Sequence, residues 1–484
     1  MGITQKNSLQ EKVLWALLAA SLLHAFYVLY LGFELPILGL HGFRQTQTAI
    51  SAYYMVHEGA WLPYMTPILG TPWMIPLEFP LYQWIVAVLH IVSGIEMDQA
   101  GRLVSFFFFL LIPLPVITIS RYLNFPKQFP LLFAIFFYFT PLYLFWGRTF
   151  LIEVHAVFLA VLWLAALTRY LDQRTLFRLL IVIVVGILGG LVKVTTFAAF
   201  ALFGAALCLH YLIKKSFLKK PIQTLISHWP LIVIFASQLV AILVWVSWSD
   251  SIKVQGEITK ALTSDLLTAW NFGSWEQRTE LQNWYEVLIR RTVRSTIGWG
   301  VLLVPLLVLP IVFQRRVIMG VAVTLLLYIT PFLIFTNLHI EHTYYQVANA
   351  LFLVATLAVL IAYLSTDPKH QRLFLAALVV VVGSQIHSFY SSQFYRAMNV
   401  EESHYYEKEI GDYLKDHTPK DSVIVIHGTA WTSAIPYYSE RKGIIFVAWI
   451  SDELIVDFHQ DSSILAGEFP VPRVNVICTQ IGLG

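Results

Sequence analysis

The chain has 484 residues, of which 57% are hydrophobic and only 13% are charged, and its mean hydropathy is +0.68. A chain this apolar is not soluble as a globule in water, so the composition predicts a polytopic membrane protein. The formal net charge of +3 is small and the basic residues form short clusters, which gives no support to nucleic-acid binding. Two cysteines, Cys208 and Cys478, are too few for a disulfide framework and match no metal-ligand spacing.

The first hydrophobic run, residues 13–31, is long enough to cross about 30 Å of hydrocarbon and lacks a small-residue cleavage site. We therefore expect a retained signal-anchor helix. Lys and Arg then fall in every second short connection, which predicts a cytoplasmic N-terminus and about eleven transmembrane helices. The expected fold class is an all-α polytopic protein of the cell membrane, with a membrane module over residues 1–389.

The first outer loop, residues 34–98, contains the polar run His-Gly-Phe-Arg-Gln-Thr-Gln-Thr from His41 to Thr48. Aromatic and apolar residues then recur at helical spacing up to Gly59, which predicts an amphipathic helix lying on the membrane surface. Four prolines between residues 61 and 76 exclude a regular helix and suit a rigid loop over a site. A surface-anchoring helix without chemistry is the alternative.

A second interfacial helix is expected from Pro80 to Gly94, because proline is favoured at the first helical position. Glu78 lies just ahead of this helix. Unpaired backbone N–H groups stabilise a carboxylate there even when it has no function. Glu78 is therefore either a capping acid or a residue of the site.

The order of these features resembles the first periplasmic loop of C-type membrane glycosyltransferases. A short outer motif leads to a helix ending in His-Glu-Gly-Ala-Trp-Leu-Pro, a proline-rich loop and then Glu-Phe-Pro-Leu-Tyr-Gln-Trp. The likeness is to the aminoarabinose transferase and protein O-mannosyltransferase group, which take a sugar from a polyprenyl-phosphate carrier. It places Arg44, Glu78 and Trp84 at the family Arg, Glu and Trp. His41 stands where the family has its catalytic Asp, and Phe79 where the aminoarabinose transferases have a phosphate-binding Lys.

Arg148 and Glu153 open the fourth expected span and resemble the family's Arg-then-acid signature. Their five-residue offset places Arg148 at the water boundary and Glu153 more than one turn deeper. A carboxylate within a span is a candidate for function. The alternative is a structural pair, either Arg148 with Glu153 or Glu153 with Lys193.

The hydrophobic run over residues 179–213 would be about 52 Å long as one helix, too long for a single crossing. Both of its flanks are basic, so we expect two crossings with a break between residues 189 and 196. This break places Lys193 on the outer side, near the depth of a lipid phosphate.

The long outer loop over residues 249–298 carries Arg290, Arg291 and Arg294 near the membrane, and one explanation is an anionic ligand such as a lipid-linked phosphate. After the ninth span, residues 342–345 resemble a His-x-Tyr-Tyr patch that related transferases often have. His339, Glu341 and His342 are also possible ligands of a divalent cation, although their spacing is no standard zinc motif. We assign no certain cofactor and no metal ligand.

Residues 390–484 differ from the preceding chain in composition and pattern. They contain a charged helical stretch at 401–415 and β-like runs at 422–427 and 443–447. They predict a small extracytoplasmic α/β domain. The segment lacks a Gly-x-Gly-x-x-Gly fingerprint, so we assign it no nucleotide site and expect acceptor contact or a stabilising role.

The expected reaction transfers a sugar, with inversion, from a polyprenyl-phosphate carrier to a lipid, glycan or protein acceptor at the outer face. His41 is the first choice of general base, since an imidazole with a pKa of about 6.5 accepts a proton near neutral pH, and Glu78 is the second. The carrier-phosphate ligands are expected to be Arg44, Arg148 and Lys193. The sugar or acceptor contacts are expected to be Gln45, Glu153, His342, Tyr344 and Tyr345.

Two other functions share these features. A transporter or flippase of lipid-linked sugars would also place charges within the membrane, but transporters commonly contain internal repeats of the span pattern and this sequence shows none. A polysaccharide polymerase would share the carrier and the outer-face site and would differ in its acceptor.

Overall fold

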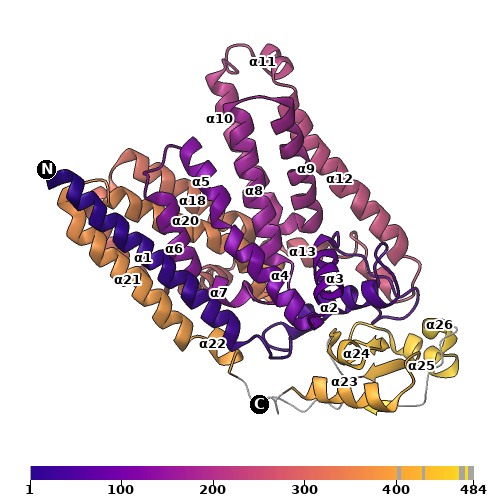
Figure 1. Cartoon of the computed structure of the whole chain (residues 1–484). Helices are drawn as coiled ribbons and strands as arrows, with labels where there is room; N and C mark the ends of the chain where they lie inside the picture. The colour runs from indigo at the N-terminus through magenta and orange to yellow at the C-terminus, as the bar shows by residue number, and fades with distance from the viewer. Residues whose placement is uncertain (1, 400–404, 428–430, 468–474, 478–484) are drawn as a thin grey trace.

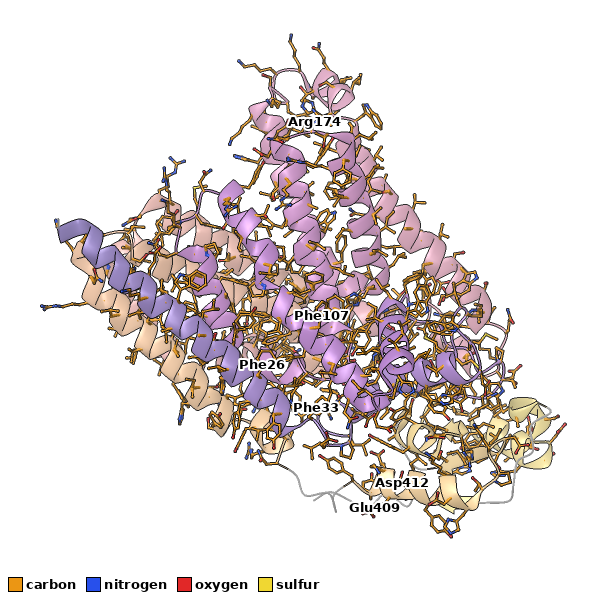
Figure 2. The ribbon with its side chains drawn as sticks, viewed as in Figure 1. Phe26, Phe33, Phe107, Arg174, Glu409 and Asp412 are labelled. Atoms are coloured by element: carbon orange, nitrogen blue, oxygen red, sulfur yellow. The ribbon has the colours of Figure 1, made fainter. Side chains whose placement is uncertain are left out.

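The computed structural model describes residues 2–399, 405–427, 431–467 and 475–477, and its long helices form a bundle with a small domain at one end (Figure 1). Phe26 and Phe107, which are 51% and 56% exposed, lie along the middle of the bundle, as expected for side chains that face lipid. Arg174 lies at one end of the molecule, and Glu409 and Asp412 lie at the other (Figure 2). The charged ends and apolar middle fit a multi-pass membrane protein.

Within the described residues, eight helices are long and apolar enough to cross a membrane, or nine if one pair bent by 76° is a single span. The expected count of eleven is therefore not confirmed. The other two expected crossings correspond to helices of 11 and 17 residues, or about 16 and 25 Å. The eight spans are Gln10–Leu31, Met97–Tyr122, Glu153–Asp172, Val194–Lys214, Pro230–Lys253, Arg315–Ile334, Thr343–Leu364 and Pro368–Ser391.

The helices of the membrane module have the following bounds. They are α1 (Gly2–Leu31), α2 (Gly42–His57), α3 (Leu81–Ser93), α4 (Met97–Leu111), α5 (Pro113–Tyr122), α6 (Phe129–Phe139), α7 (Pro141–Trp146), α8 (Glu153–Asp172), α9 (Leu176–Val192), α10 (Val194–Lys214), α11 (Pro221–Ser227), α12 (Pro230–Lys253), η1 (Thr259–Leu262), α13 (Thr268–Phe272), α14 (Trp275–Thr279), α15 (Leu281–Asn283), η2 (Trp284–Val293), α16 (Arg294–Ile297), η3 (Gly298–Leu302), α17 (Val304–Val312), α18 (Arg315–Ile334), α19 (Thr336–Glu341), η4 (Thr343–Tyr345), α20 (Gln346–Leu364), η5 (Pro368–His370), α21 (Gln371–Ser391) and α22 (Gln393–Ala397).

The predicted break in the double-length hydrophobic run is confirmed at Lys193. The residue has an extended backbone between α9 and α10. Gly189 lies against the side chain of Phe197, and a Cβ there would come within 2.9 Å of the ring. The glycine therefore allows the two helices to approach each other closely at the break.

Both helices expected in the first outer loop are present as α2 and α3, and α3 is flanked by Pro80 and Gly94 as predicted. α2 is not exposed along one face, as a helix that only anchors the surface would be, since every residue from Gln45 to Met55 is buried against the rest of the chain. Its expected position at the membrane surface stays a prediction. The Ser and Thr residues of α2 tolerate burial because they bond to the preceding turn. Thr48 Oγ1 donates to the Arg44 carbonyl and Ser51 Oγ to the Gln47 carbonyl, each at 3.0 Å.

The C-terminal residues form the predicted α/β domain, with a parallel sheet in the order β2-β1-β3. Two of its strands were predicted, and β3 was not. The elements are α23 (Tyr406–His417), β1 (Val423–His427), α24 (Ala434–Ser439), β2 (Lys442–Phe446), α25 (Asp452–Gln460), α26 (Ser463–Ala466) and β3 (Asn475–Ile477). The start of the predicted charged helix, residues 401–404, lies outside the described residues, as does Cys478.

The proline-rich loop of residues 61–76 pairs with the outer edge of this sheet. The backbone N–H groups of Gly443 and Ile445 donate to the Pro67 and Ile68 carbonyls at 2.8 and 3.0 Å. Gly70 has a φ of +80°, and a Cβ there would lie 2.8 Å from the Leu465 carbonyl oxygen. The loop thus covers the free edge of β2 and is held in place by the C-terminal domain.

A buried carboxylate fastens the same domain to α4. Asp98 accepts hydrogen bonds from the hydroxyls of Tyr437, at 2.6 Å, and Tyr438, at 2.9 Å. The Tyr438 hydroxyl also accepts from the backbone N–H of Ile37 at 2.9 Å. The C-terminal domain is therefore bound to the membrane module through α4 and the segment before α2.

Candidate active site

The centre of the candidate site is an ion pair between the first turn of α2 and the loop that leads into α3. Arg44 Nη2 donates to Glu78 Oε1 at 2.5 Å. Burial raises the pKa of Glu78, but the positive charges of Arg44 and Lys193 outweigh burial and leave this pKa below its ordinary value. Glu78 is thus an ionised carboxylate directed at Arg44, whereas Pro80 is the N-cap of α3.

A second ion pair joins Lys193 to Glu153, and both side chains are almost completely buried. Glu153 is the first residue of α8 and Arg148 lies in the turn before it, so the expected helical offset that places Glu153 more than one turn deeper than Arg148 is wrong. The Lys193 Nζ also lies 4.3 Å from the centre of the Tyr345 ring, at a distance typical of a cation–π contact. The pairing of Glu153 with Lys193 is one of the structural alternatives that the sequence left open.

The two ion pairs lie on the same side of the bundle. The backbone N–H of Phe79, next to Glu78, donates to the carbonyl of Leu191 at 3.1 Å. This bond joins the first outer loop to the end of α9, two residues before Lys193. Residues more than 100 positions apart in the sequence therefore form one ionic cluster.

His41 lies beside this cluster in a left-handed backbone conformation, with a φ of 53°. Its Nε2 is 2.9 Å from the Thr343 hydroxyl and accepts from the Thr343 backbone N–H at 3.4 Å. Burial, together with the positive charge of Arg291, lowers the pKa of His41 to about 4. The imidazole is therefore neutral near pH 7, and its Nε2 is already bound.

Three aromatic residues of the predicted His-x-Tyr-Tyr patch line the space between His41 and Lys193. Tyr344 packs edge-to-face with His41 at 4.9 Å and stacks on His342 at 5.2 Å. Burial, with the positive charges nearby, lowers the pKa of His342 to about 3. The structure brings together five of the predicted site residues, namely His41, His342, Tyr344, Tyr345 and Lys193.

Two predicted site residues serve the local backbone instead. Gln45 accepts from the Phe150 N–H and donates to the Leu40 carbonyl, each at 3.1 Å. Arg148 was expected at the water boundary, but it is only 3% exposed and donates to the carbonyl of Gly32. Its side chain lies against the end of α1, because the chain turns between α7 and α8 instead of continuing as one helix. Arg148 is therefore not part of the ionic cluster.

The arginines of the long outer loop diverge from one another. Arg290 pairs with Glu286, Arg291 donates to the Ile340 carbonyl, and Arg294 lies over the Trp299 ring. Within the described residues, no three His, Cys, Asp or Glu side chains form a group able to hold a metal ion. The possible cation ligands, His339, Glu341 and His342, therefore do not converge.

A small cavity of about 20 Å3 adjoins the Arg44–Glu78 pair, with room for about one water molecule. Three buried polar atoms of its lining have no hydrogen-bond partner among the described residues, namely Gln47 Nε2, Gln83 Oε1 and Trp431 Nε1. The lining residues are Arg44, Gln47, Thr48, Ser51, Tyr64, Thr66, Ile75, Leu77, Glu78, Gln83 and Trp431.

Sequence reasoning had missed most of this lining. The proline-rich loop was expected to cover a site, and it supplies Tyr64 and Thr66. Gln83, a polar residue on the largely apolar α3, carried a signal that helical periodicity overlooked, whereas Gln47 is one of several polar residues in the run from His41 to Thr48. Nothing in the sequence pointed to Trp431, which comes from the C-terminal domain.

No protein-family model and no curated protein sequence matches this chain. Among solved structures, ArnT from Cupriavidus metallidurans bound to undecaprenyl phosphate matches with a TM-score of 0.60 and 12% identity, over 93% of this chain and 88% of that one. The chain has the C-type glycosyltransferase (GT-C) fold. A second GT-C neighbour is the oligosaccharyltransferase AglB from Archaeoglobus fulgidus, in complex with an inhibitory peptide and a dolichol-phosphate. It matches with a TM-score of 0.54 and 10% identity, over 90% of this chain and 64% of that one.

These matches confirm the resemblance stated from the first outer loop at the level of fold. They extend it beyond that loop, because the match to ArnT covers both the helical bundle and most of the C-terminal region. The GT-C fold and the apolar helices together identify a multi-pass membrane protein.

Proposed function

We propose that this protein is a membrane glycosyltransferase that moves a sugar from a polyprenyl-phosphate carrier to an acceptor at the extracytoplasmic face. The observation that carries the proposal is the Arg44–Glu78 pair beside a cavity whose polar atoms lack partners, at one end of an apolar bundle with the GT-C fold. Two neighbours with this fold were solved with polyprenyl phosphates, undecaprenyl phosphate in ArnT and dolichol-phosphate in AglB.

Arg44 and Lys193 are the proposed ligands of the carrier phosphate. In the structure described here each is paired with a carboxylate, Glu78 or Glu153. The planar guanidinium of Arg44 suits two parallel hydrogen bonds to a phosphate, and the Lys193 ammonium supplies a point charge. Carrier binding would draw Arg44 away from Glu78. The phosphate charge would then raise the pKa of Glu78 and make it a stronger base.

Glu78 is the preferred general base. His41, the first choice from sequence, has its Nε2 bound to Thr343, whereas the Glu78 carboxylate borders the cavity whose polar atoms lack partners. In the proposed step Glu78 takes the proton of the acceptor hydroxyl as that oxygen bonds to the anomeric carbon. The bond from this carbon to the carrier phosphate oxygen breaks, and its electron pair stays on the phosphate. A single displacement of this kind inverts the anomeric carbon.

The three unpartnered polar atoms are the proposed contacts for sugar hydroxyls. Gln47 and Gln83 are 5% and 4% exposed, so a missing partner is costly for each. The cavity as it stands has room for about one water molecule. The sugar would therefore enter after carrier binding has drawn Arg44 away from Glu78, and its hydroxyls would then supply the missing partners. Trp431 offers an indole N–H and an aromatic face. Tyr344 and Tyr345 are proposed to form the wall that holds Lys193, and Glu153 to orient this lysine.

The direct test is to incubate purified protein with a panel of polyprenyl-phosphate sugars and candidate acceptors. Mass spectrometry should detect free carrier phosphate and a glycosylated product in equal amounts, and both should fall in Glu78→Gln. Sugar that crosses the bilayer of reconstituted vesicles without release of carrier phosphate would indicate a transporter instead. Products that grow by repeated addition would indicate a polymerase.

A further inference from the structure

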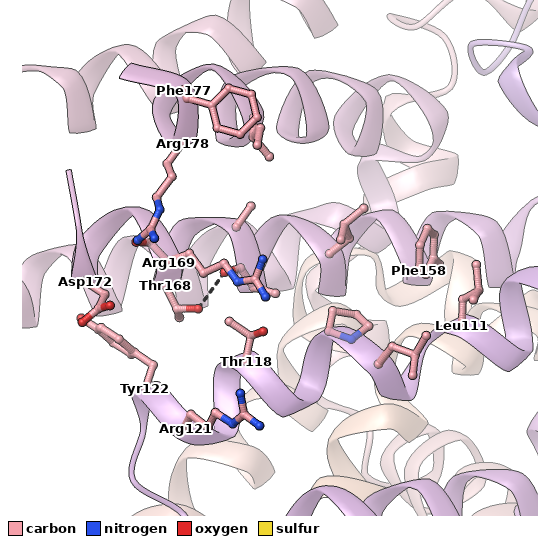
Figure 3. Close-up of a pocket in the computed structure, with 16 residues that line it drawn as sticks. Leu111, Thr118, Arg121, Tyr122, Phe158, Thr168, Arg169, Asp172, Phe177 and Arg178 are labelled. Carbon is pink, nitrogen blue, oxygen red and sulfur yellow. Dashed lines mark hydrogen bonds between the residues drawn. The ribbon is translucent and has the colours of Figure 1, made fainter. Parts of the chain in front are cut away.

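A groove of about 1030 Å3 runs along the side of the bundle, lined by residues of α4, α5, α8 and α9. Its two ends differ in chemistry. Figure 3 shows the arginine side chains gathered near Asp172 at one end, and Leu111 and Phe158 at the other. The groove is separate from the cavity at Glu78 and shares no lining residue with it.

The charged end is positive and has unused hydrogen-bond donors. The guanidinium groups of Arg121 and Arg169 form no hydrogen bond or ion pair with any residue in the described ranges. Arg178 donates to the Arg169 carbonyl at 2.8 Å. Asp172 is the only carboxylate among the described lining residues. With three guanidinium groups and one carboxylate, this end of the groove favours the binding of an anionic group.

The remainder of the groove is apolar and opens to the side of the molecule. Leu114 and Phe177 are 57% and 72% exposed. Leu114 lies on the candidate span Met97–Tyr122, and Phe177 lies on the shorter apolar helix α9 beside it. Their exposed faces are therefore expected to meet lipid rather than water. A ligand that fills the groove must therefore combine an anionic group with apolar chains.

The position of the charged end places it in the leaflet opposite the active site. Arg169 follows Glu153 by 16 residues on α8, which corresponds to about 24 Å along the helix axis. This rise is comparable to the thickness of the hydrocarbon core. A carrier whose phosphate reacts at Arg44 cannot occupy this end of the groove in the same pose.

We propose that the groove is a specific binding site for an anionic two-chain phospholipid of the leaflet opposite the Glu78 cavity. Arg121 and Arg169 bind its phosphate, and an acyl chain lies along Leu114 and Phe158. The charge pattern of the loops predicts that this leaflet is cytoplasmic, where anionic lipids attract basic groups near the surface. The site does not depend on the proposed sugar transfer.

The test is a native mass spectrometry titration of the full-length protein with dioleoyl phosphatidylglycerol and with dioleoyl phosphatidylcholine, which have the same acyl chains. The parent protein should bind phosphatidylglycerol, which is anionic, more tightly than phosphatidylcholine. The triple variant Arg121→Gln/Arg169→Gln/Arg178→Gln should weaken phosphatidylglycerol binding about tenfold or more, because it removes the three positive charges that face the lipid phosphate.

The matched control removes three positive charges elsewhere on the same predicted side, in Arg315→Gln/Arg316→Gln/Lys369→Gln, and should bind as the parent does. Thr118→Trp places a large side chain midway along the groove and should weaken binding of both lipids. Equal loss in the control triple variant would overturn the proposal, because it would indicate diffuse charge attraction. Displacement of the lipid by equimolar undecaprenyl phosphate, or by inorganic phosphate, would also overturn it.

Discussion

The Arg44 guanidinium, in the first turn of α2, donates a 2.5 Å hydrogen bond to the carboxylate of Glu78, which lies three residues before α3. Each charge offsets the cost of burying the other. If this arginine also receives the carrier phosphate, then its planar geometry matters as well as its charge.

Arg44→Lys should therefore weaken binding of the carrier phosphate about tenfold. The substitution keeps the positive charge and loses one of two charge-assisted hydrogen bonds, each of which contributes about 1.5–3 kcal/mol. Equilibrium binding of undecaprenyl phosphate to the purified variant measures the change. Arg290→Lys, at an exposed pair with Glu286, is the control and should bind as the parent does. Unaltered binding in Arg44→Lys would remove Arg44 from the phosphate site.

Glu78→Gln should lower turnover by a factor of about 10² to 10⁴, the usual contribution of a general base. In the parent, the positive charges of Arg44 and Lys193 hold the pKa of Glu78 below its ordinary value. Because activity requires the ionised carboxylate, kcat/KM should fall only below the usual pKa of a glutamate. In Arg44→Gln, the loss of positive charge raises the pKa of Glu78. The fall of kcat/KM on the acid side of its pH profile should therefore move to higher pH. An acid limb that stays in place would show that another group is the base.

His41→Asn should keep most of the parent's turnover. Asparagine accepts the left-handed backbone that His41 adopts, so the substitution removes the ring without straining the chain. The lost hydrogen bond to Thr343 should lower the free energy of unfolding by about 1 kcal/mol. Steady-state turnover and thermal unfolding distinguish the two effects. A rate loss of 10²-fold or more in a folded variant would instead restore His41 as the base.

The break between α9 and α10 should be accessible from the outer side. Val194 is 42% exposed beside the buried Lys193, which makes it a better reporter than its threonine neighbours. After replacement of Cys208 and Cys478, Val194→Cys should react with a membrane-impermeant thiol reagent in intact cells. Lys215→Cys, at the other end of α10, should react only after permeabilisation. The reverse pattern would invert the topology.

The double substitution Tyr437→Phe/Tyr438→Phe should loosen the C-terminal domain. It removes both hydroxyls that donate to the buried Asp98, and each lost bond to a buried charge costs about 1–3 kcal/mol. Limited proteolysis should then cut within residues 400–484 faster than in the parent, and turnover should fall with it. Tyr413→Phe, at a side chain that is 61% exposed, is the matched control. Parent-like resistance to protease in the double variant would show that other contacts hold the domain.

Several features could be predicted because they depend on local composition. The break at Lys193 follows from basic flanks around a run too long for one crossing, and α3 follows from Pro80 and Gly94. The choice of Arg44 and Glu78 as candidate site residues followed from a resemblance in the order of motifs, and their pairing could not be derived from spacing alone. Each of these features depends on a short stretch of the sequence.

Other features depend on which elements pack together, and the hydropathy of the sequence does not show this packing. A polar helix such as α2 has the same pattern on a membrane surface as between other helices, and only the tertiary structure distinguishes the two. Arg148 was misplaced because a hydrophobic run does not reveal the turn between α7 and α8. Trp431 reaches the cavity from a domain more than 300 residues along the chain.

The pairing of the proline-rich loop with β2 also sets the order in which the protein matures. The loop is among the first segments to be synthesised, yet its backbone partners at Gly443, Ile445 and Leu465 emerge hundreds of residues later. A nascent chain interrupted before residue 443 could insert its helices in the bilayer while the loop over the cavity lacked its support. If the cavity is the site of the proposed transfer, a chain that ends before the C-terminal domain would be expected to insert in the membrane and to lack activity.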